Sequence, residues 1–554
     1  MTYDQQLADR LFPNVTLLPQ DVIAQYPRRE LAAAAKVTRF APSPTGFLTI
    51  GGLYATFISE RLAHQSGGVF FLRIEDTDRK REVKGSIDGI ISALDYFGIR
   101  RDEGITHSDG ESGRYGPYKQ SARASIYHVF LKRLVAEGLA YPCFCDAEEL
   151  NAIREAQGRR NEPTGYYGDW AVYRHAAPEK VQEQLDAGKP YVIRLKSPGS
   201  ADRKIRITDL IKGELSMPEN VQDIVLMKSD GIPTYHFAHA VDDYLMGTTH
   251  VIRGDEWLSS LPVHVQLFEV LGLPAPAYGH LAPIMKMDGA SKRKFSKRKD
   301  PDAAVLYYQQ QGFPGDTISE YFMTLANSNY EEWRSAHPDE PYQHFLLETS
   351  RMSAGGPLFD MHKLTDISKD VISRMTADGV YAQCLDWAKE YDDKLYRHLS
   401  DDPDYAKRVF NIGRGGAKPR KDLSRWSDVR PVSGYFFDGL FESGGARAET
   451  ILPPNAGLPR AKRIVELYME TWDYKDDRDS WFEKMKHTAE QVGFAKDMKS
   501  FKKSPDSYQG HVGDVAMVLR AALTHSAFTP DLYDVMQVMG EDRVRLRLNR
   551  FVGR

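Results

Sequence analysis

The chain has 554 residues, of which 42% are hydrophobic and 27% are charged, and its formal net charge is −4. This length predicts several domains, and three cysteines exclude a disulfide framework. No apolar run is long enough to cross a membrane, and the N-terminus lacks the basic and apolar regions of a secretory signal. We therefore expect a cytoplasmic protein without a membrane partner. The small net charge does not exclude a nucleic-acid partner, because binding depends on where basic groups cluster.

A strand–helix–strand–helix pattern opens the folded part of the chain. Residues 36–40 ("KVTRF") predict a strand, the loop 41–52 ("APSPTGFLTIGG") follows, and residues 53–68 predict a helix that ends at a glycine pair. The apolar run 69–76 ("VFFLRIED") predicts a buried strand. A second helix is indicated by apolar residues at helical spacing, namely Ile87, Ile90, Ile91 and Leu94. This order predicts a parallel βαβ unit with its ligand at the carboxyl ends of the strands, where the loop 41–52 lies.

Later segments have different patterns. Residues 141–225 mix short strands and turns without a βαβ repeat, which predicts an insertion. Residues 224–256 ("IVLMKSDGIPTYHFAHAVDDYLMGTTHVIRGDE") are interpreted as buried strands and tight turns, the second half of the parallel sheet. From about residue 300 the pattern is mostly helical, with loops or linkers expected at 411–434 and 442–462.

The C-terminal helices carry clear signals. One helix is predicted to begin with Thr529 as its N-cap and Pro530 at its first position, and to end at Gly540. Its apolar stripe is Leu532, Val535, Met536 and Met539. In the final helix, basic and apolar residues are predicted on separate faces: Arg543, Arg547 and Arg550 on one, and Val544, Leu548 and Phe551 on the other.

The loop 41–52 is a candidate anion site. Gly46, Gly51 and Gly52 allow close approach of a ligand to the backbone, and the helix that follows offers free N–H groups. A plain strand–helix turn would explain these glycines equally well. Neither the dinucleotide fingerprint nor the P-loop motif is present.

A run of basic residues, 292–300 ("KRKFSKRKD"), follows the flexible "MDGAS" segment. Ammonium groups on a mobile loop suit closure over a polyphosphate as charge develops. A solvated basic loop is the more frequent interpretation of an isolated charge run.

Four residues fall at or near the ends of predicted sheet strands: Arg39, Glu75, Tyr235 and Arg253. Two arginines can bind two carboxylates by bidentate pairing, and a carboxylate can bind an ammonium group. An α-amino acid with an acidic side chain needs this complement. Ordinary ion pairs at a sheet edge are the alternative.

Cys143 and Cys145 form a Cys-x-Cys pair that could supply two zinc ligands. The next cysteine is Cys384, and the nearby residues Tyr166, Tyr167 and Asp169 offer no third sulfur. Because structural zinc needs four good ligands, we predict that no zinc or other metal is bound here and that the cysteines are core residues.

Together these segments resemble the class I aminoacyl-tRNA synthetases, specifically the bacterial-type glutamyl-tRNA synthetases. "RFAPSPTGFLTIGG" resembles the first signature loop of the family and "KFSKR" the second, a mobile lysine–serine–lysine loop. Six other segments match family patterns: "RIEDTDR", "GPYKQSAR", "YPCFCDAEEL", "VIRLK", "PRKDLSRWSDV" and the long run that begins "DGIPTYHFAHAVDD". The resemblance extends from about residue 36 almost to the C-terminus and leaves residues 1–35 outside it.

The resemblance implies an α/β Rossmann-type catalytic domain with an inserted α+β acceptor-binding domain, followed by an all-α anticodon-binding region. The implied division of the chain is an N-terminal extension (1–35), the first half of the catalytic domain (36–140), the inserted acceptor-binding domain (141–225), the second catalytic half with the stem-contact region and the "KFSKR" loop (226–345), and the helical anticodon-binding region (346–554).

Residue roles follow only from this resemblance. The implied glutamate-binding residues are Arg39, Ser43, Glu75, Tyr235 and Arg253. The implied ATP-binding residues are Ala41, Thr49, Gly51, Gly52, Glu256, Lys294, Ser296 and Lys297, among which Lys294, Lys297 and Thr49 have catalytic roles. Two residues depart from the pattern. Thr49 replaces the first histidine of the first signature loop, and His239 stands where relatives often have an amide or an aliphatic side chain.

The implied activity is that of a glutamate–tRNA ligase. It would activate L-glutamate with ATP and Mg²⁺, without zinc, and transfer it to the 3′ end of glutamate tRNA. Glutamine tRNA remains open as a second acceptor, and we expect a monomer. Arg253 argues against a glutamine ligase, and the long C-terminal part argues against a relative that modifies a tRNA base and against a plain nucleotide hydrolase. A catalytically weak or inactive tRNA-binding paralogue, suggested by Thr49, is the remaining alternative.

Overall fold

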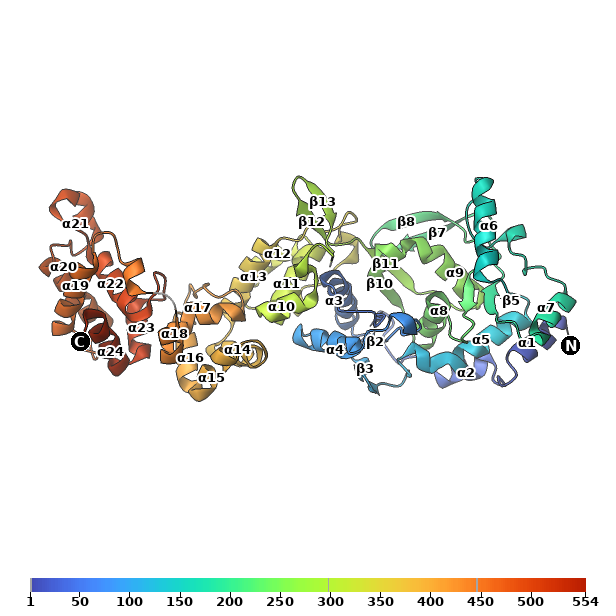
Figure 1. The fold of residues 1–554 in the computed structure, drawn as a ribbon, viewed down its shortest axis with the longest axis horizontal. Coiled ribbons are helices and arrows are strands. Elements are labelled where there is room, and N and C mark those ends of the chain that lie inside the picture. Colours follow the sequence, from blue (N-terminus) through green and yellow to red (C-terminus); the bar gives the residue numbers. More distant parts are fainter. Residues whose placement is uncertain (1, 297, 445–446) are drawn as a thin grey trace. The chain divides into compact units, whose positions relative to one another are not determined.

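The computed structural model describes residues 2–296, 298–444 and 447–554. The chain divides into two compact units, Met1–Tyr307 with Ser319–Asp360 and Tyr308–Ile318 with Met361–Arg554 (Figure 1). In the described residues every named strand lies in the first unit, and the second unit is helical. The predicted order of an α/β part followed by an all-α part is therefore confirmed.

The first unit is built on a parallel βαβ core, as predicted. β1 (Val37–Phe40) and β2 (Val69–Leu72) pair in parallel, joined by α3 (Ile50–His64). β2 then pairs in parallel with β3 (Glu103–His107), which forms a hairpin with β4 (Gly110–Ser112). The predicted stripe of the second helix is buried in α4 (Ser86–Tyr96), at Ile87, Ile90, Ile91 and Leu94. The carboxyl ends of β1 and β2 thus lie together at one edge.

A second parallel pair, β10 (His250–Gly254) and β11 (Ala277–Leu281), runs alongside this core. The N–H of Thr249 donates to the carbonyl of Val37 at 2.9 Å, which places β10 next to β1. The interpretation of residues 224–256 as strands and turns was wrong in its middle, where α8 (Tyr235–Leu245) is a helix. The error arose because α8 is buried on most sides, and a short apolar run then cannot be assigned by periodicity alone.

An antiparallel sheet connects the two ends of the segment 141–225 and consists of β5 (Ala140–Cys143), β6 (Val192–Leu195) and β9 (Val225–Met227). Its predicted short strands are confirmed, and β7 (Lys204–Asp209) forms a hairpin with β8 (Gly213–Pro218). Directly after β7, the N–H of Leu210 donates to the carbonyl of Tyr278 at 2.8 Å, so the hairpin lies against β11.

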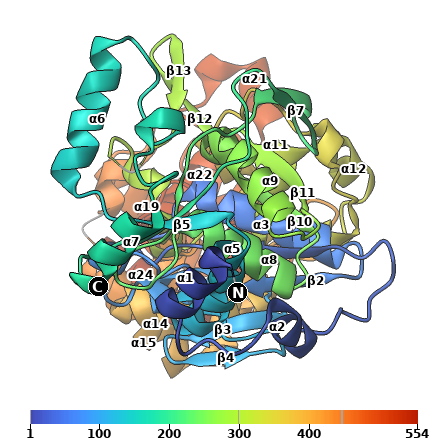
Figure 2. The same ribbon diagram turned by 90° about the vertical axis from the view of Figure 1, so that its right-hand side faces the viewer.

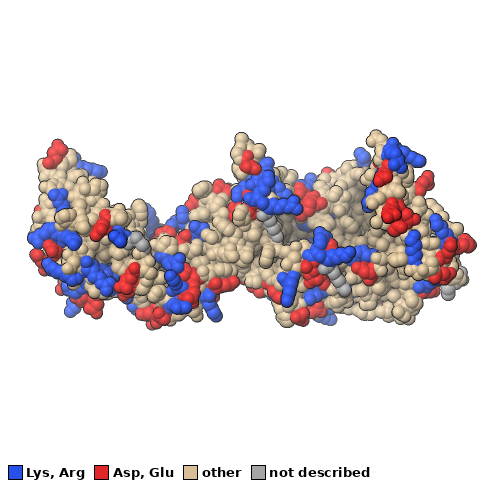
Figure 3. All heavy atoms as spheres, viewed as in Figure 1, with Lys and Arg blue, Asp and Glu red and all other residues tan. Residues whose placement is uncertain are grey.

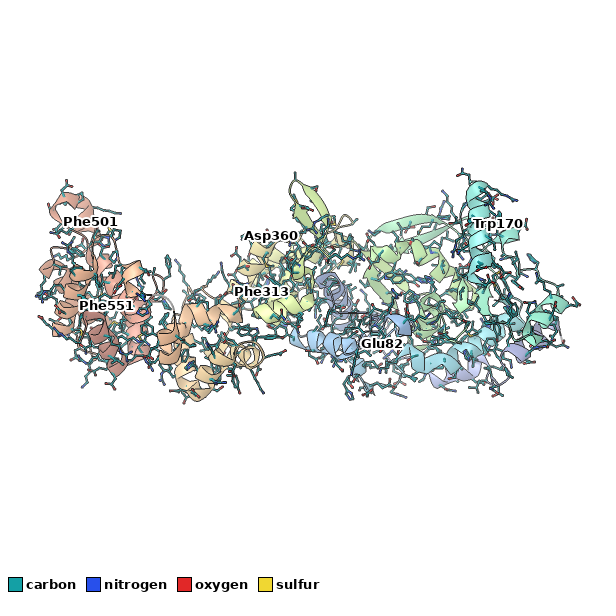
Figure 4. The ribbon with its side chains drawn as sticks, viewed as in Figure 1. Glu82, Trp170, Phe313, Asp360, Phe501 and Phe551 are labelled. Atoms are coloured by element: carbon teal, nitrogen blue, oxygen red, sulfur yellow. The ribbon has the colours of Figure 1, made fainter. Side chains whose placement is uncertain are left out.

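Two helices in this segment escaped the prediction, α6 (Ala147–Arg159) and α7 (Pro178–Asp186). α6 was recognisable from its capping box, in which the Asp146 side chain accepts from the N–H of Glu149. Trp170, labelled in Figure 4, donates its Nε1–H to Glu162 at 2.8 Å just beyond α6.

Residues 1–35 are an integral part of the first unit. α1 (Tyr3–Leu11) and α2 (Pro19–Gln25) pack against α5 (Ala124–Ala136), and Figure 2 shows α1 beside α5. Leu7, Ala8, Leu11 and Phe12 join the hydrophobic core around α5. Arg29 forms a bidentate ion pair with Glu103, with two N–H···O distances of 2.8 Å. The extension therefore covers apolar surface of α5 and is tied to β3 by the Arg29–Glu103 ion pair.

The remaining elements of the first unit lead into the second. They are α9 (Leu261–Val270), the antiparallel hairpin of β12 (Met285–Asp288) and β13 (Ser291–Lys294), α10 (Val305–Gln311), α11 (Gly315–Ala326) and α12 (Tyr330–Ala336). α10 and α11 have residues in both units.

The second unit is a set of helices around one hydrophobic core. In chain order they are α13 (Met361–Arg374), α14 (Ala377–Tyr391), α15 (Asp393–Asp401), α16 (Pro403–Asn411), α17 (Val429–Ser433), α18 (Asp438–Ser443), α19 (Leu458–Thr471), α20 (Arg478–Gln491), α21 (Met498–Lys503), α22 (Val512–Thr524), α23 (Leu532–Met539) and α24 (Glu541–Val552). α17 and α19 enter the two stretches predicted as loops or linkers, which are therefore only partly irregular.

The predicted start of α23 was wrong, and its stripe and end are confirmed. Asp531 is the N-cap, because its carboxylate accepts from the N–H groups of Tyr533 and Asp534, so Thr529 and Pro530 precede the helix. The four apolar residues are buried and Gly540 is the C-cap. In α24 the predicted basic face is occupied by ion pairs: Arg543 and Arg547 contact Asp438, and Arg550 contacts Glu442.

Candidate active site

The loop 41–52, which we call the signature loop, ends at the first turn of α3. Thr49 is the N-cap of α3, and its Oγ1 accepts a hydrogen bond from the N–H of Gly52 at 3.0 Å. α3 therefore begins at Ile50, before the predicted start at residue 53. A Cβ added at Gly51 would meet only Thr49 Oγ1, at 4.0 Å, so packing does not require a glycine there. The open space and the unpaired N–H groups of a helix start together suit an anion.

The lysine loop, residues 292–300, is followed by a segment that contacts the signature loop. Thr49 forms an isolated β-bridge with Ala304, and the N–H of Val305 donates to the carbonyl of Leu48 at 3.1 Å. Lys and Arg side chains gather on the β12–β13 hairpin (Figure 3). Among them Lys294 is exposed at the end of β13. Backbone contacts thus fix the signature loop to the segment that directly follows the lysine loop.

One basic residue of the lysine loop is fixed rather than mobile. Arg293 pairs with Asp300 through two N–H···O contacts of 2.6 and 2.8 Å, and Asp300 also accepts from the N–H of Ser296 at 3.1 Å. This pairing anchors the base of the hairpin and positions Ser296. Lys297 lies outside the described residues.

A buried charge cluster lies beneath the carboxyl ends of β1 and β2. It consists of Arg39, Arg73, Glu75, Asp242 and Asp243. Arg73 Nη1 lies 2.7 Å from Asp243 and Arg73 Nη2 lies 3.1 Å from Glu75, while Arg39 Nε lies 3.2 Å from Asp243. Arg39 and Glu75 were predicted from the sequence as site residues, whereas Arg73, Asp242 and Asp243 were not. The adjacent acidic pair "DD" inside the apolar run of α8 was the available signal.

The electrostatics of this cluster set two protonation states. Burial raises the pKa of Glu75 to about 7, although Arg73 and Arg39 oppose the rise. Burial also disfavours the charge on Asp243, but Arg39 and Arg73 outweigh it and hold the Asp243 pKa well below its usual value. Asp243 is therefore a fixed anion, whereas Glu75 titrates near neutral pH.

Arg253 is surrounded by neutral acceptors. Its Nε lies 3.0 Å from His280 Nε2, its Nη1 lies 3.0 Å from His264 Nδ1, and its Nη2 lies 3.5 Å from the carbonyl of Trp257. Burial lowers the pKa of both histidines below the ordinary value. In the described part of the chain the polar contacts of Arg253 are these three, none with a carboxylate, although its side chain is buried. A buried guanidinium without an anion is suited to bind a carboxylate from a ligand.

Tyr235 and His239 lie on α8 between Arg253 and the charge cluster. The prediction of a strand end at Tyr235 was wrong, because Tyr235 is the first residue of α8. Burial raises the pKa of Tyr235 to about 12, and its hydroxyl feels the charges of Glu75, Arg253 and Arg39. Burial lowers the pKa of His239 to about 4, and the ring contacts Asp243 at 2.9 Å and the Tyr278 hydroxyl at 3.0 Å. His239 is thus a neutral side chain fixed against Asp243 of the cluster.

The structure therefore brings Arg39, Glu75, Tyr235 and Arg253 together. Three more predicted site residues lie nearby in the chain: Ala41 and Ser43 are in the signature loop, half-buried and exposed respectively, and Glu256 is exposed in the short 3₁₀ turn (Asp255–Ser260) that follows β10. These positions surround the carboxyl ends of β1, β2 and β10.

Both sulfurs of the Cys-x-Cys pair contact the hydroxyl of one tyrosine. Cys143 Sγ lies 3.3 Å and Cys145 Sγ lies 3.5 Å from the hydroxyl of Tyr166, while Tyr167 donates to the carbonyl of Pro163. Across the described ranges, no three His, Cys, Asp or Glu side chains are grouped to hold a metal ion.

Among the described helices, none has the length and apolarity needed to cross a bilayer.

Comparison with known proteins identifies the family. A family profile described as "tRNA synthetases class I (E and Q), catalytic domain" matches residues 36–366, and one described as "Anticodon binding domain" matches residues 495–552. This chain belongs to the class I tRNA synthetases for glutamate and glutamine. The family places the parallel strands of the first unit in a Rossmann-type catalytic domain, as the sequence predicts.

Relatives match over their whole length. Glutamate–tRNA ligase from Clostridium perfringens is 52% identical over 552 residues, covering 100% of both chains, and that from Sorangium cellulosum is 44% identical over 96% of this chain and 98% of its own. A crystal structure of a glutamate–tRNA ligase from Elizabethkingia meningosepticum, in complex with its amino acid, is 27% identical, with a TM-score of 0.74 over 93% of this chain and 99% of its own. Residues 1–35 are therefore not outside the resemblance, because the Clostridium relative aligns through them. None of these relatives is named as an inactive paralogue.

Proposed function

We propose that the protein is a glutamate–tRNA ligase that activates L-glutamate with ATP and esterifies the product to the 3′ end of glutamate tRNA. The observation that carries the choice of amino acid is Arg253. Its buried guanidinium is held by two neutral imidazoles and a carbonyl and lacks an anionic partner among the described residues. An acidic side chain would supply that anion, whereas an amide would not.

The rest of the amino acid fits the charge cluster. Glu75 would bind the ammonium group, and the substrate's positive charge would bring the Glu75 pKa back down from its value near 7. Arg39, Ser43 and Tyr235 would hold the α-carboxylate in place. Because Arg39 is already paired with Asp243 on one side, its direction is fixed before the substrate arrives.

The chemistry then needs no side-chain nucleophile. An oxygen of the α-carboxylate attacks the α-phosphorus of ATP, the bond to the bridging oxygen breaks, and pyrophosphate leaves. The terminal ribose hydroxyl of the tRNA next attacks the activated carbonyl carbon, and AMP leaves. Positioning and charge stabilisation carry both steps.

The nucleotide would lie between the signature loop and the lysine loop. The ATP site would be lined by Ala41, Gly51, Gly52 and Glu256. The Thr49 hydroxyl would donate a hydrogen bond to a phosphate. The phosphates would also be contacted, as pyrophosphate leaves, by Lys294, Ser296 and Lys297. Mg²⁺ would arrive as part of the ATP substrate complex. Support comes from the helix start at Thr49 and from the backbone contacts between the signature loop and the segment directly after the lysine loop.

The tRNA would use the three regions assigned by the resemblance. Residues 141–225 would bind the acceptor end, the stem-contact region within 226–345 would follow the helix, and residues 346–554 would bind the anticodon. The profile match at residues 495–552 supports the last assignment. We further propose a cytoplasmic monomer, with glutamine tRNA as a second acceptor to be tested.

Glutamate-dependent exchange of pyrophosphate into ATP, measured with tRNA present, tests the site. Changing Arg253 to Ala should raise the glutamate KM by about 10- to 150-fold, from the roughly 1.5–3 kcal/mol of a charged hydrogen bond, and leave the ATP KM nearly unchanged. Arg100→Ala, at a side chain that is 75% exposed, is the control and should alter neither. Equal increases in both KM values for Arg253→Ala would assign Arg253 a structural role only.

A further inference from the structure

A chain of hydrogen bonds links the Arg253 guanidinium to the segment 141–225. Arg253 Nε lies 3.0 Å from His280 Nε2, and His280 Nδ1 lies 2.6 Å from Asp209 Oδ2. Asp209 is the last residue of β7, whereas His280 and Arg253 lie on the neighbouring strands β11 and β10. All three side chains are buried, so water does not compete for these contacts.

In this series of hydrogen bonds, the donor and the acceptor of each bond are fixed. A guanidinium can only donate, so His280 Nε2 must carry a lone pair. A neutral imidazole has its single proton on the other nitrogen, so Nδ1–H donates to Asp209. Burial lowers the pKa of His280, and the neutral ring that this favours is the form the contacts require. Asp209 therefore sets the tautomer, and the tautomer provides the acceptor for Arg253.

The two carboxylate oxygens of Asp209 have separate tasks. Oδ1 accepts from the backbone N–H groups of Ile211 and Lys212 at 2.9 Å each and from that of His280 at 3.2 Å. These bonds hold the turn between β7 and β8. Oδ2 accepts the hydrogen bond from His280 Nδ1–H. A substitution that keeps Oδ1 and changes Oδ2 can therefore test the hydrogen bond to His280 without removing the bonds that hold the turn.

The contacts also leave Arg253 with the donors that a carboxylate needs. A guanidinium has five N–H groups, and His280, His264 and the Trp257 carbonyl engage one each. Two N–H groups remain, which matches the two oxygens of a bidentate carboxylate. Loss of the His280 acceptor would let the guanidinium rotate. The two remaining N–H groups would then no longer be aligned with the two carboxylate oxygens.

We propose that Asp209 is a positioning residue for amino-acid selection: acting through His280, it orients Arg253 to bind a side-chain carboxylate and to reject an amide. The inference rests on the proposed role of Arg253. It also makes the β7–β8 hairpin, which belongs to the predicted acceptor-binding segment, a support of the amino-acid site.

Asp209→Asn is the decisive variant. The Asn oxygen can keep the three backbone N–H bonds of the turn, which places its NH₂ group against His280 Nδ1. That nitrogen must then accept, so the proton moves to Nε2 and faces the Arg253 Nε–H, donor against donor. The hairpin stays folded, but the hydrogen bond between Arg253 and His280 is lost. Glu214→Gln is the matched control, because it removes one carboxylate from the same hairpin, where among the described residues the Glu214 side chain forms a hydrogen bond with Thr208 alone.

Pyrophosphate exchange with glutamate and with glutamine, tRNA affinity and the melting midpoint are measured for each variant. For Asp209→Asn the glutamate KM should rise by up to about 150-fold, the upper value for a lost charged hydrogen bond, and the preference for glutamate over glutamine should fall. The ATP KM, tRNA Kd and melting midpoint should match those of the Glu214→Gln control. If Arg253→Ala raises the glutamate KM but Asp209→Asn leaves it unchanged, the inference is overturned and the proposed function still stands. An unchanged KM in Arg253→Ala itself would instead remove the role of Arg253.

His280 supplies a second test that does not depend on the fold of the hairpin variant. In His280→Gln the side-chain oxygen can accept from Arg253 and the NH₂ group can donate to Asp209, so the glutamate KM should stay close to the wild-type value. His280→Leu offers no acceptor and should reproduce the loss seen in Asp209→Asn. Equal glutamate KM values for the Gln and Leu variants would contradict the hydrogen-bond chain.

Discussion

Thr49 tests the signature loop directly because its single hydroxyl has two tasks in the proposed site. Its oxygen caps α3 by accepting from the N–H of Gly52 at 3.0 Å. A hydroxyl that accepts one hydrogen bond still has its own proton to donate, and we assign that proton to a phosphate of ATP. In Thr49→Val both are lost, with a shape close to that of threonine.

The two losses have separate magnitudes. Removal of an N-cap costs roughly 0.5–2 kcal/mol of stability, which should lower the melting midpoint of the first unit. Removal of a neutral donor costs roughly 0.5–1.5 kcal/mol, a decrease of about 2- to 12-fold in kcat/KM for ATP. Thr49→Ser keeps the cap and the donor and should stay near the wild type in both measurements.

Thr49→Asp separates the tasks. An aspartate caps a helix as well as a threonine does, so the melting midpoint should be kept. Its carboxylate cannot donate and would repel the triphosphate, so glutamate activation should fall further than in Thr49→Val. Pyrophosphate exchange with tRNA present and thermal melting give the two readouts. Full activity in Thr49→Asp, or equal activity in Thr49→Val and Thr49→Ser, would refute the assignment of a phosphate contact to Thr49.

Three further predictions concern the lysine loop, the ammonium site and metal. Lys297→Ala should lower kcat by about 10²–10³ with little change in the ATP KM, as for other donors that act mainly in the transition state, and a normal turnover would make this a solvated basic loop. Because the Glu75 pKa is raised to about 7, its carboxylate is mostly protonated at pH 6 and ionised at pH 8. The glutamate KM should therefore fall about tenfold as the pH rises between these values, and Glu75→Gln should abolish this dependence. Elemental analysis should find no stoichiometric zinc, since Cys143 and Cys145 offer only two sulfurs, and about one zinc per chain would overturn this.

Local signals in the sequence were sufficient for the βαβ core. The alternation of a strand, the loop 41–52, a helix and the apolar run at 69–76 is encoded by residues close in sequence, and the structure confirms it. The same proximity explains the stripe of α4 and the stripe and end of α23. Such features depend on periodicity and capping, which neighbouring residues determine.

Features made by distant residues could not be predicted. Arg73 meets Asp243 across 170 positions, and Asp209 meets His280 across 71, so neither pair has a local pattern. α8 was misassigned because its burial hides the polar face that normally marks a helix. The start of α23 shows a different limit, since Thr529 and Asp531 are both good caps and only the backbone geometry selects Asp531.

Charging of purified glutamate and glutamine tRNAs, followed with labelled glutamate and in parallel with labelled glutamine, tests the central claim most directly. We predict that the wild-type protein forms glutamyl-tRNA with ATP and glutamate tRNA and that no label is transferred from glutamine. Charging of glutamine tRNA with glutamate would show that this tRNA is a second acceptor. Failure to charge either tRNA with glutamate, by a protein that still binds RNA, would contradict the ligase and indicate the non-catalytic paralogue.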